Sequence, residues 1–213
     1  MAGPGARGPW LTGRVATSIL LLRHARSTWN EEGRWQGWAD PPLSEEGARA
    51  ALHAAAHDAL RAVEAAAASD LQRAVGTAEL LGEDRSWPPV RRYRGLRERG
   101  AGEWTGRTRA DIEATWPNAL LTPVVEIPGG EAPAAVTARG VATLHRIAAE
   151  WPDACVVAVT HGALIRLVEG HLGAPSATVA NLGGRWVTAD AGRLVLGDKV
   201  EPLVAPTPRA GGH

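Results

Sequence analysis

The chain has 213 residues, and its 23 basic residues are balanced by 23 acidic ones, so its formal net charge is zero. That length suffices for one domain with a sizeable core, and the neutral balance argues against proteins that bind nucleic acids or membrane surfaces, which usually carry a basic excess. A single cysteine excludes a disulfide framework, and the longest apolar run near the N-terminus is too short for a signal sequence or a membrane span, so we expect a cytoplasmic protein.

The two ends of the chain differ in composition from the part between them. Residues 1–14 and the tail 202–213 are rich in Gly and Pro, and we expect both to be disordered. A G-x-G-x-x-G pattern at 3–8 has no strand before it, so it does not indicate a dinucleotide site. The one lysine, Lys199, lies outside any Gly-Lys-Ser/Thr sequence, which excludes a P-loop. We expect one domain over 15–201 and no cofactor.

Within that domain, strand and helix patterns alternate. The apolar run 17–22 predicts a buried strand, and Ser44 is a good N-cap for an Ala-rich helix that extends to about Val63. The later predicted elements are a helix from Ser69-Asp70 to about Gly82, a short helix capped at Thr108 that ends before Pro117, a long helix over about 133–151, a strand over 155–160 followed by a helix to about Gly173, and a hairpin over 186–196. This alternation predicts an α/β fold, a three-layer αβα sandwich with a mostly parallel central sheet.

Residues suited to binding an oxyanion follow the predicted strands, at the edge where α/β sheets bind ligands. Arg23 and His24 end the first strand, and His161 ends a later one. Arg73 falls in the first turn of a helix, where backbone N–H groups and the helix dipole favour an anion. With Glu98 in a loop rich in Gly and Arg, they supply two arginines, two imidazoles and a carboxylate, which suits phosphoryl transfer because imidazole is a good phosphoryl acceptor. Each residue also has a structural alternative, such as a core histidine, a helix cap or a solvated charged loop.

Five short motifs follow one another along the chain. They are Arg-His-x-x-Ser-Thr-Trp-Asn at 23–30, Arg-Trp-Gln-Gly-Trp-Ala-Asp at 34–40, Ser-Asp-Leu-x-Arg-Ala at 69–74, Leu-Arg-Glu at 96–98 and Thr-His-Gly at 160–162. In this order they resemble the histidine phosphatase superfamily, the cofactor-dependent phosphoglycerate mutase-like family, from about residue 18 to about residue 173. The resemblance implies a phosphoglycerate mutase-like fold with a short cap insertion at about 100–130.

The resemblance also implies roles for individual residues. His24 matches the histidine that becomes phosphorylated, and Glu98 matches the proton donor. The groups that hold the phosphate are implied to be Arg23, Arg73 and His161. The positions that line the phosphate end of the pocket are implied to be Asn30, Gln36 and Gly37. Ser27 lies within the first motif, and we include its hydroxyl among the substrate-binding groups.

Two residues depart from the usual pattern of the family. Ala25 stands where Gly is usual, which would be awkward if this position needs a positive φ or a close approach of the backbone to phosphate. Arg26 stands where Glu is common, so we expect it to join Arg23 and Arg73 and to make the anion site more positive. Neither change touches a catalytic atom.

The favoured function is that of a metal-independent phosphatase that hydrolyses a small phosphorylated metabolite through a phosphohistidine. Arginines can neutralise the phosphoryl oxygens, so no metal is required, and His53 and His57 have no apparent third ligand. Phosphoglycerate mutases of the family carry a longer insertion after the Glu-bearing loop, whereas only 22 residues separate Gly106 from Gly129. Mutase-type phosphoryl transfer is the first alternative, and a non-catalytic phosphate-binding module is the second. We expect no nucleic-acid or membrane partner and allow a homodimer.

Overall fold

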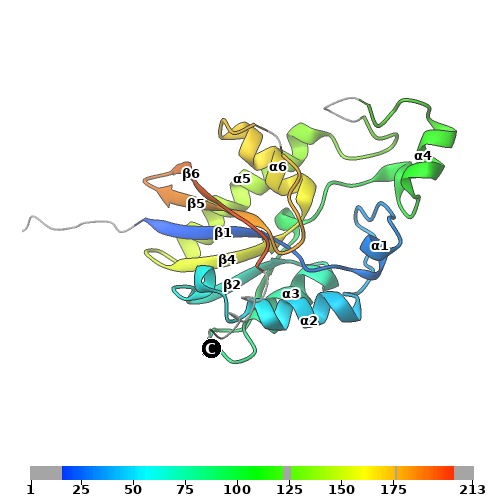
Figure 1. Cartoon of the computed structure of the whole chain (residues 1–213). Coiled ribbons are helices and arrows are strands. Elements are labelled where there is room, and N and C mark those ends of the chain that lie inside the picture. Colours follow the sequence, from blue (N-terminus) through cyan, green and yellow to red (C-terminus); the bar gives the residue numbers. More distant parts are fainter. Residues whose placement is uncertain (1–15, 122–125, 176, 204–213) are drawn as a thin grey trace, which may run out of the picture.

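The computed structural model describes residues 16–121, 126–175 and 177–203. Among these residues, six strands form one sheet in the order β3-β2-β4-β1-β5-β6. The strands are β1 (Thr17–Arg23), β2 (Ala65–Ser69), β3 (Arg91–Tyr93), β4 (Cys155–Thr160), β5 (Gly184–Asp190) and β6 (Arg193–Val200). Strands β1 to β4 run parallel, whereas β5 is antiparallel to β1, and β6 pairs antiparallel with β5 at one edge (Figure 1). The mostly parallel α/β sheet expected from the sequence is confirmed.

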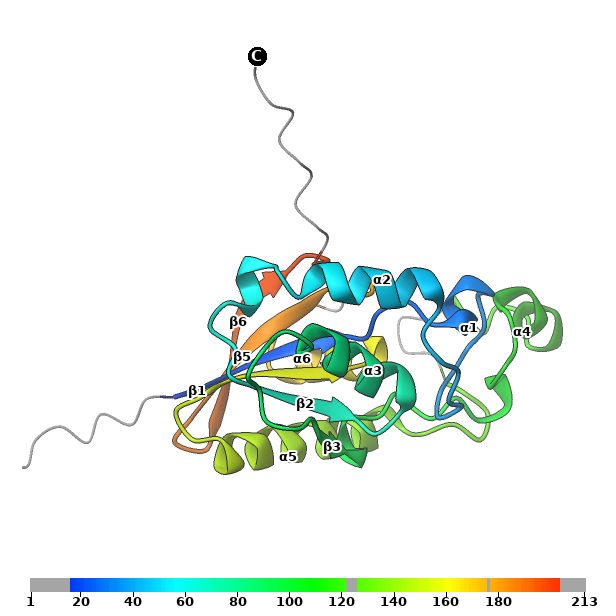
Figure 2. The same ribbon diagram turned by 90° about the horizontal axis from the view of Figure 1, so that it is seen from below.

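Helices cover both faces of this sheet, which gives three layers (Figure 2). The longer helices are α2 (Glu45–Ala54), α3 (Gln72–Leu81), α5 (Pro133–Glu150) and α6 (Gly162–His171). Leu20 and Leu22 of β1 belong to the core cluster that α2 and α3 complete, whereas Ile19 and Leu21 belong to the cluster that α5 and α6 complete. Successive strand residues point to opposite faces, so a continuous apolar run serves both layers.

The segment before β2 differs from the sequence-based prediction. The Ala-rich helix expected to reach Val63 ends at Ala54, and after a 3₁₀ turn at Asp58–Leu60 the chain enters β2, a strand that was not predicted. Ala65–Ser69 is entirely buried between β3 and β4. Alanine favours helix intrinsically, but the small side chains let helices approach both faces of the sheet, and packing overrides propensity. The short β3 was also not predicted.

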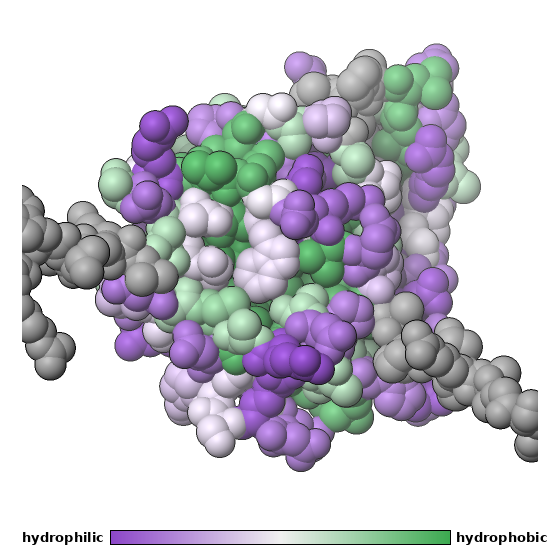
Figure 3. Space-filling view, turned by 60° about the vertical axis from the view of Figure 1, so that its left-hand side comes forward, coloured by the Kyte–Doolittle hydropathy of each residue, from purple (hydrophilic) through white to green (hydrophobic). Residues whose placement is uncertain are grey.

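The other predicted elements appear close to their expected positions. Thr108 caps α4 (Arg109–Thr115) through a reciprocal capping box with Asp111, as the sequence suggested. The disordered tail was predicted to begin at residue 202, but the chain is still packed on the domain at Leu203. This residue is buried, and its backbone N–H donates to the Leu182 carbonyl at 2.9 Å. Residues 1–14, with their G-x-G-x-x-G pattern, lie outside the described residues. In the face shown by Figure 3, hydrophobic side chains form patches interrupted by hydrophilic ones.

A small second core lies beyond the carboxyl ends of the strands. It belongs to residues 100–121 and 126–131, which we call the cap, and which include a 3₁₀ turn at Gly102–Trp104 and α4. Trp104, Ile112 and Ile127 are buried together, and Trp35 packs edge-on against Trp104 with ring centroids 5.0 Å apart. Figure 1 shows α4 and the short α1 (Thr28–Glu31) on this side of the sheet. No helix in the described part of the chain is both long and apolar enough to cross a membrane.

Candidate active site

The two histidines of the predicted site meet at the carboxyl edge of the sheet. His24 follows β1 and His161 follows β4, and these strands are parallel neighbours in which Arg23 pairs with Thr160. The backbone N–H of His24 donates to the Thr160 carbonyl at 2.9 Å. The two imidazole centroids lie 5.0 Å apart, and the exposed fractions are 2% for His24 and 0% for His161. Strand pairing therefore brings together two residues that are far apart in sequence.

The orientation of the His24 ring is set by its neighbour. Nδ1 of His24 lies 2.6 Å from the carbonyl oxygen of Ala25. A carbonyl can only accept, so Nδ1 carries the proton and Nε2 keeps its lone pair. Ala25 is fully buried, its φ is not positive, and its N–H donates to Thr77 Oγ1 at 3.0 Å. The methyl group at this position is thus part of the core, and the positive φ that would have favoured Gly is not required.

Both site histidines are held in their neutral form. Burial, and then the positive charge of Arg73, lower the pKa of His24 and of His161 well below the ordinary value of 6.5. The nearby Arg23 acts in the same direction on both rings. At neutral pH the His24 ring is therefore an uncharged nitrogen base, which is the form that can attack phosphorus.

The two arginines of the site are fixed by backbone carbonyls. Arg73 lies in the first turn of α3 and donates through Nη1 to Ala39 at 2.8 Å and through Nη2 to Gly37 at 3.0 Å. Arg23 donates through Nη1 to the Val179 carbonyl at 2.7 Å. Burial lowers the pKa of Arg73 to about 10, so its guanidinium stays charged at neutral pH. These carbonyls hold the side chains without neutralising them.

Arg23, Arg73 and His161 carry buried side-chain nitrogens that have no hydrogen-bond partner within the described part of the chain. Among the described residues, five buried side-chain atoms lack a hydrogen-bond partner, and four of them are Arg23 Nε, Arg73 Nε and the two ring nitrogens of His161. The fifth is the indole nitrogen of Trp104 in the cap. Buried polar groups are nearly always paired in folded proteins, so a cluster of unpaired ones needs an explanation. A tetrahedral oxyanion placed against His24 would accept hydrogen bonds from both arginine Nε atoms and from the one ring nitrogen of neutral His161 that carries a proton.

Glu98 joins this cluster from a loop that precedes the cap. Its carboxylate accepts the N–H of Ala163, in the first turn of α6, at 3.1 and 3.3 Å, and the N–H of Arg99 at 2.8 Å. The negative charge of Glu98 acts to raise the pKa of both Arg23 and Arg73, which places it within electrostatic reach of the anion site. A carboxylate within electrostatic reach of the two arginines that bind the anion can exchange protons with a bound ester or with water.

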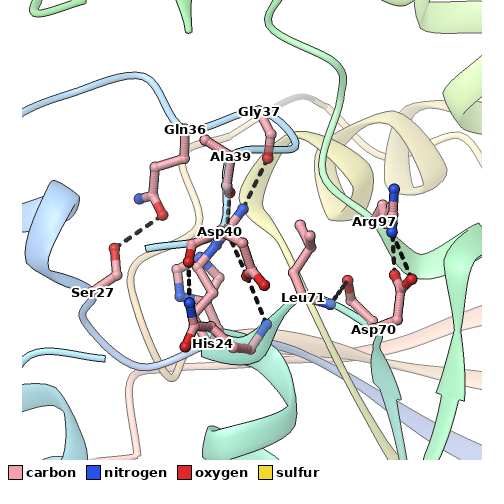
Figure 4. Close-up of polar contacts among 12 residues, drawn as sticks. His24, Ser27, Gln36, Gly37, Ala39, Asp40, Asp70, Leu71 and Arg97 are labelled. Atoms are coloured by element: carbon pink, nitrogen blue, oxygen red, sulfur yellow. Dashed lines mark hydrogen bonds and ion pairs between the residues drawn. The ribbon is translucent and has the colours of Figure 1, made fainter. Parts of the chain in front are cut away.

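The remaining predicted residues near His24 form a supporting network. The Ser27 hydroxyl donates to Gln36 Oε1 at 3.0 Å, and these two side chains point toward one another (Figure 4). Asn30 Oδ1 accepts the Ser27 N–H at 3.1 Å, which completes the capping box of α1. Gly37 has a φ of +49°, and a Cβ there would lie 2.6 Å from the backbone nitrogen of Ala101, so this position requires glycine.

Arg26 lies away from the anion site. Its guanidinium pairs with Glu46 at 3.1 Å, and 49% of the side chain is exposed. The backbone at Arg26 runs against α2, where its carbonyl accepts the Ser44 N–H at 3.0 Å. The expectation that Arg26 adds to the positive charge around the phosphate is not met, because the loop after β1 turns this side chain toward α2.

Some contributors were not found from sequence. Asn181 Nδ2 donates to the His24 carbonyl at 2.8 Å, and Thr77 Oγ1 donates to the Arg73 carbonyl at 2.7 Å. Asn181 lies in a loop without a recognisable motif, so nothing in the sequence pointed to it. His57, which was considered as half of a metal pair, instead accepts the Ala59 N–H through its ring. Within the described ranges, no group of three His, Cys, Asp or Glu side chains is arranged to hold a metal ion.

The chain is similar to known proteins both in sequence and in fold. The sequence profile of the histidine phosphatase superfamily (branch 1) matches residues 19–188. Glucosyl-3-phosphoglycerate phosphatase from Mycobacterium tuberculosis is 38% identical over 195 residues, which cover 80% of this chain and 87% of the relative. Metal-independent phosphoserine phosphatase from Arabidopsis thaliana is 31% identical over 192 residues, 86% of this chain and 78% of that protein. A solved structure of mycobacterial glucosyl-3-phosphoglycerate phosphatase with VO3 superposes with a TM-score of 0.76 at 30% identity, covering 89% of this chain and 100% of the other.

Proposed function

Because the chain belongs to the histidine phosphatase superfamily, we propose that it hydrolyses a small phosphomonoester through a phosphohistidine formed on His24. The observation that carries the proposal is the group of unpaired buried nitrogens on Arg23, Arg73 and His161 around a neutral imidazole. Two relatives that match most of the chain are named phosphatases.

In the first half of the reaction, the phosphoryl group moves from the ester to His24. Arg23, Arg73 and His161 bind the phosphoryl oxygens, and the two guanidinium charges neutralise the charge that builds on them. Nε2 of His24 attacks phosphorus while the bond to the ester oxygen breaks, and Glu98 gives its proton to the departing alkoxide. The Ala25 carbonyl, which binds the Nδ1 proton, stabilises the positive charge that the ring gains when Nε2 is phosphorylated.

In the second half, water removes the phosphoryl group. Glu98, now ionised, takes a proton from a water molecule as its oxygen attacks phosphorus. The phosphorus–nitrogen bond breaks, inorganic phosphate forms, and His24 returns to its neutral state with the proton still on Nδ1. The same carboxylate thus serves as acid and then as base, and each turnover restores the starting protonation.

The experiment that tests this function is a panel of phosphomonoesters assayed for free phosphate. Glucosyl-3-phosphoglycerate and phosphoserine belong in the panel because the relatives act on them by name. 3-Phosphoglycerate with 2,3-bisphosphoglycerate tests the mutase alternative. We expect phosphate release from at least one ester and a loss of more than about a thousandfold in His24→Ala. Isomerisation without free phosphate, or turnover by His24→Ala, would contradict the proposal.

A further inference from the structure

Arg139 on α5 donates hydrogen bonds to the loop that carries Glu98. The guanidinium of Arg139 uses each of its N–H donors, at donor–acceptor distances of 2.6 to 2.9 Å. The acceptors are the backbone carbonyls of Gly95, Arg97 and Glu98 and the two carboxylate oxygens of Glu131. Three of these bonds therefore fix the main chain of the loop at and just before the proton donor.

The carboxylate partner of Arg139 comes from the cap. The Glu131 N–H donates to the Gly100 carbonyl at 3.0 Å, and the Gly100 N–H donates back to Glu131 Oε2 at 3.2 Å. Arg99 Nε donates to the Glu131 carbonyl at 2.7 Å. Glu131 thereby joins the two ends of the cap to one another and to α5. We call Arg139 and Glu131 together the clasp.

The ion pair of the clasp is largely buried, which protects it from competition by water. The side chains of Arg139 and Glu131 are 21% and 15% exposed, so their charges are only partly screened. Burial raises the pKa of Glu131, but hydrogen bonds from Arg139 and the Gly100 N–H outweigh it, and the net pKa lies below the ordinary value. The loop also packs tightly on α5, because a Cβ at Gly95 would lie 1.9 Å from Thr143 Oγ1.

Resting on the phosphatase function proposed above, we propose that Arg139 is a positioning residue, which with Glu131 sets Glu98 for proton transfer to the leaving group. Arg139 contacts only the main chain of Glu98, at 2.9 Å, and the carboxylate is held separately by Ala163 and Arg99. Loss of the clasp therefore releases the main chain that carries the donor, and Arg139→Lys does so while it keeps the positive charge that acts on His161. Small displacements of a catalytic group can cost about a hundredfold in rate.

A misplaced proton donor has a signature that a general loss of structure lacks. A phenoxide needs a proton as it leaves, whereas 2,4-dinitrophenoxide is a weak base that leaves unaided. The value of kcat/KM reports the first half of the reaction, in which Glu98 acts as the acid. Phenyl phosphate and 2,4-dinitrophenyl phosphate therefore separate proton transfer from phosphate binding.

The experiment measures kcat/KM for both esters in the wild type, Arg139→Lys, Glu131→Gln and Glu98→Gln. Arg146→Lys is the matched control, because Arg146 also lies on α5 and pairs with a glutamate, Glu150, at 2.7 Å on the exposed surface. We expect Arg139→Lys and Glu131→Gln to lose about ten times more activity on phenyl phosphate than on the dinitrophenyl ester. We call this excess loss of kcat/KM on phenyl phosphate the leaving-group bias. Glu98→Gln should show a larger bias, and Arg146→Lys should show none.

Combining Arg139→Lys with Glu98→Gln should add no further bias, because both changes remove the same proton transfer. Equal losses on the two esters in both clasp variants, or no loss in either, would overturn the proposal. If Arg139→Lys does not fold, Glu131→Gln decides the question by itself. Failure of the underlying function would look different, because the wild-type protein would then release no phosphate from either ester.

Discussion

The phosphate end of the site and its proton-donor end are held in different ways. At the phosphate end, His24 and His161 follow adjacent parallel strands and Arg73 lies in the first turn of a helix, so regular structure positions each group. At the other end, Glu98 lies in a loop that the clasp joins to α5 and the cap, and that an ion pair between Arg97 and Asp70 also holds. The two ends can therefore be disturbed separately. Changes at the phosphate end should affect every ester alike, and changes at the proton-donor end should affect esters according to their leaving groups.

The largest difference at the phosphate end is expected between two arginines. Arg73 lies close to His24 in space, whereas Arg26 is close to it only in sequence. Arg73→Met removes a fully buried cation whose Nε is unpaired, and it should lower kcat/KM by about 10²- to 10³-fold on any ester. Arg26→Met removes an exposed cation paired with Glu46, and it should change kcat/KM by less than about twofold. Steady-state kinetics on phenyl phosphate, with melting temperatures to verify folding, measures both. Equal losses of kcat/KM in the two variants would mean that Arg26 contributes to the anion site, which would contradict its placement here.

A smaller effect tests the burial of the imidazoles. The pKa values of His24 and His161 lie below 6.5 in the folded protein, chiefly because of burial and then because of Arg73. As pH falls below about 6.5, the unfolded chain binds protons that the native state does not, so the free energy of unfolding decreases. Each group contributes a slope of up to about 1.4 kcal/mol per pH unit, from the ordinary pKa down to the lowered one.

Replacing one of the two imidazoles should make this dependence shallower. Urea unfolding at about pH 7 and about pH 5.5 should show a smaller loss of stability in His161→Gln than in the wild type. His53→Gln is the control, because His53 is exposed on α2 and should leave the dependence unchanged. An identical pH dependence in all three proteins would mean that the ring of His161 is not held neutral.

The same difference between the two ends decided what could be predicted from the sequence. His24, Arg73 and His161 were found because each directly follows a strand or begins a helix, so local patterns place it at the ligand-binding edge. Arg139 and Asn181 were missed because their contacts join residues far apart in sequence. Arg26 was misplaced for the opposite reason, since closeness to His24 in sequence says nothing about which way a loop turns its side chain.

The fold was predictable where apolar patterns agreed with local propensity. The strand at β4 and the long helix α5 were expected within one residue of their observed bounds. β2 was missed because its alanines favour helix in isolation, and only the sheet on either side selects the extended form. The core of the cap was not predicted, because it includes a contact between Trp104 and Trp35, which are far apart in sequence, with ring centroids 5.0 Å apart.

The most direct test of the account is to find where the phosphoryl group is held during turnover. Wild-type protein mixed with 2,4-dinitrophenyl phosphate, quenched in alkali and digested, should yield a peptide phosphorylated on His24, formed and lost at rates that match turnover. Mass spectrometry of that peptide locates the phosphoryl group. Phosphate on another side chain, or turnover with no His24 adduct at any time, would contradict the mechanism.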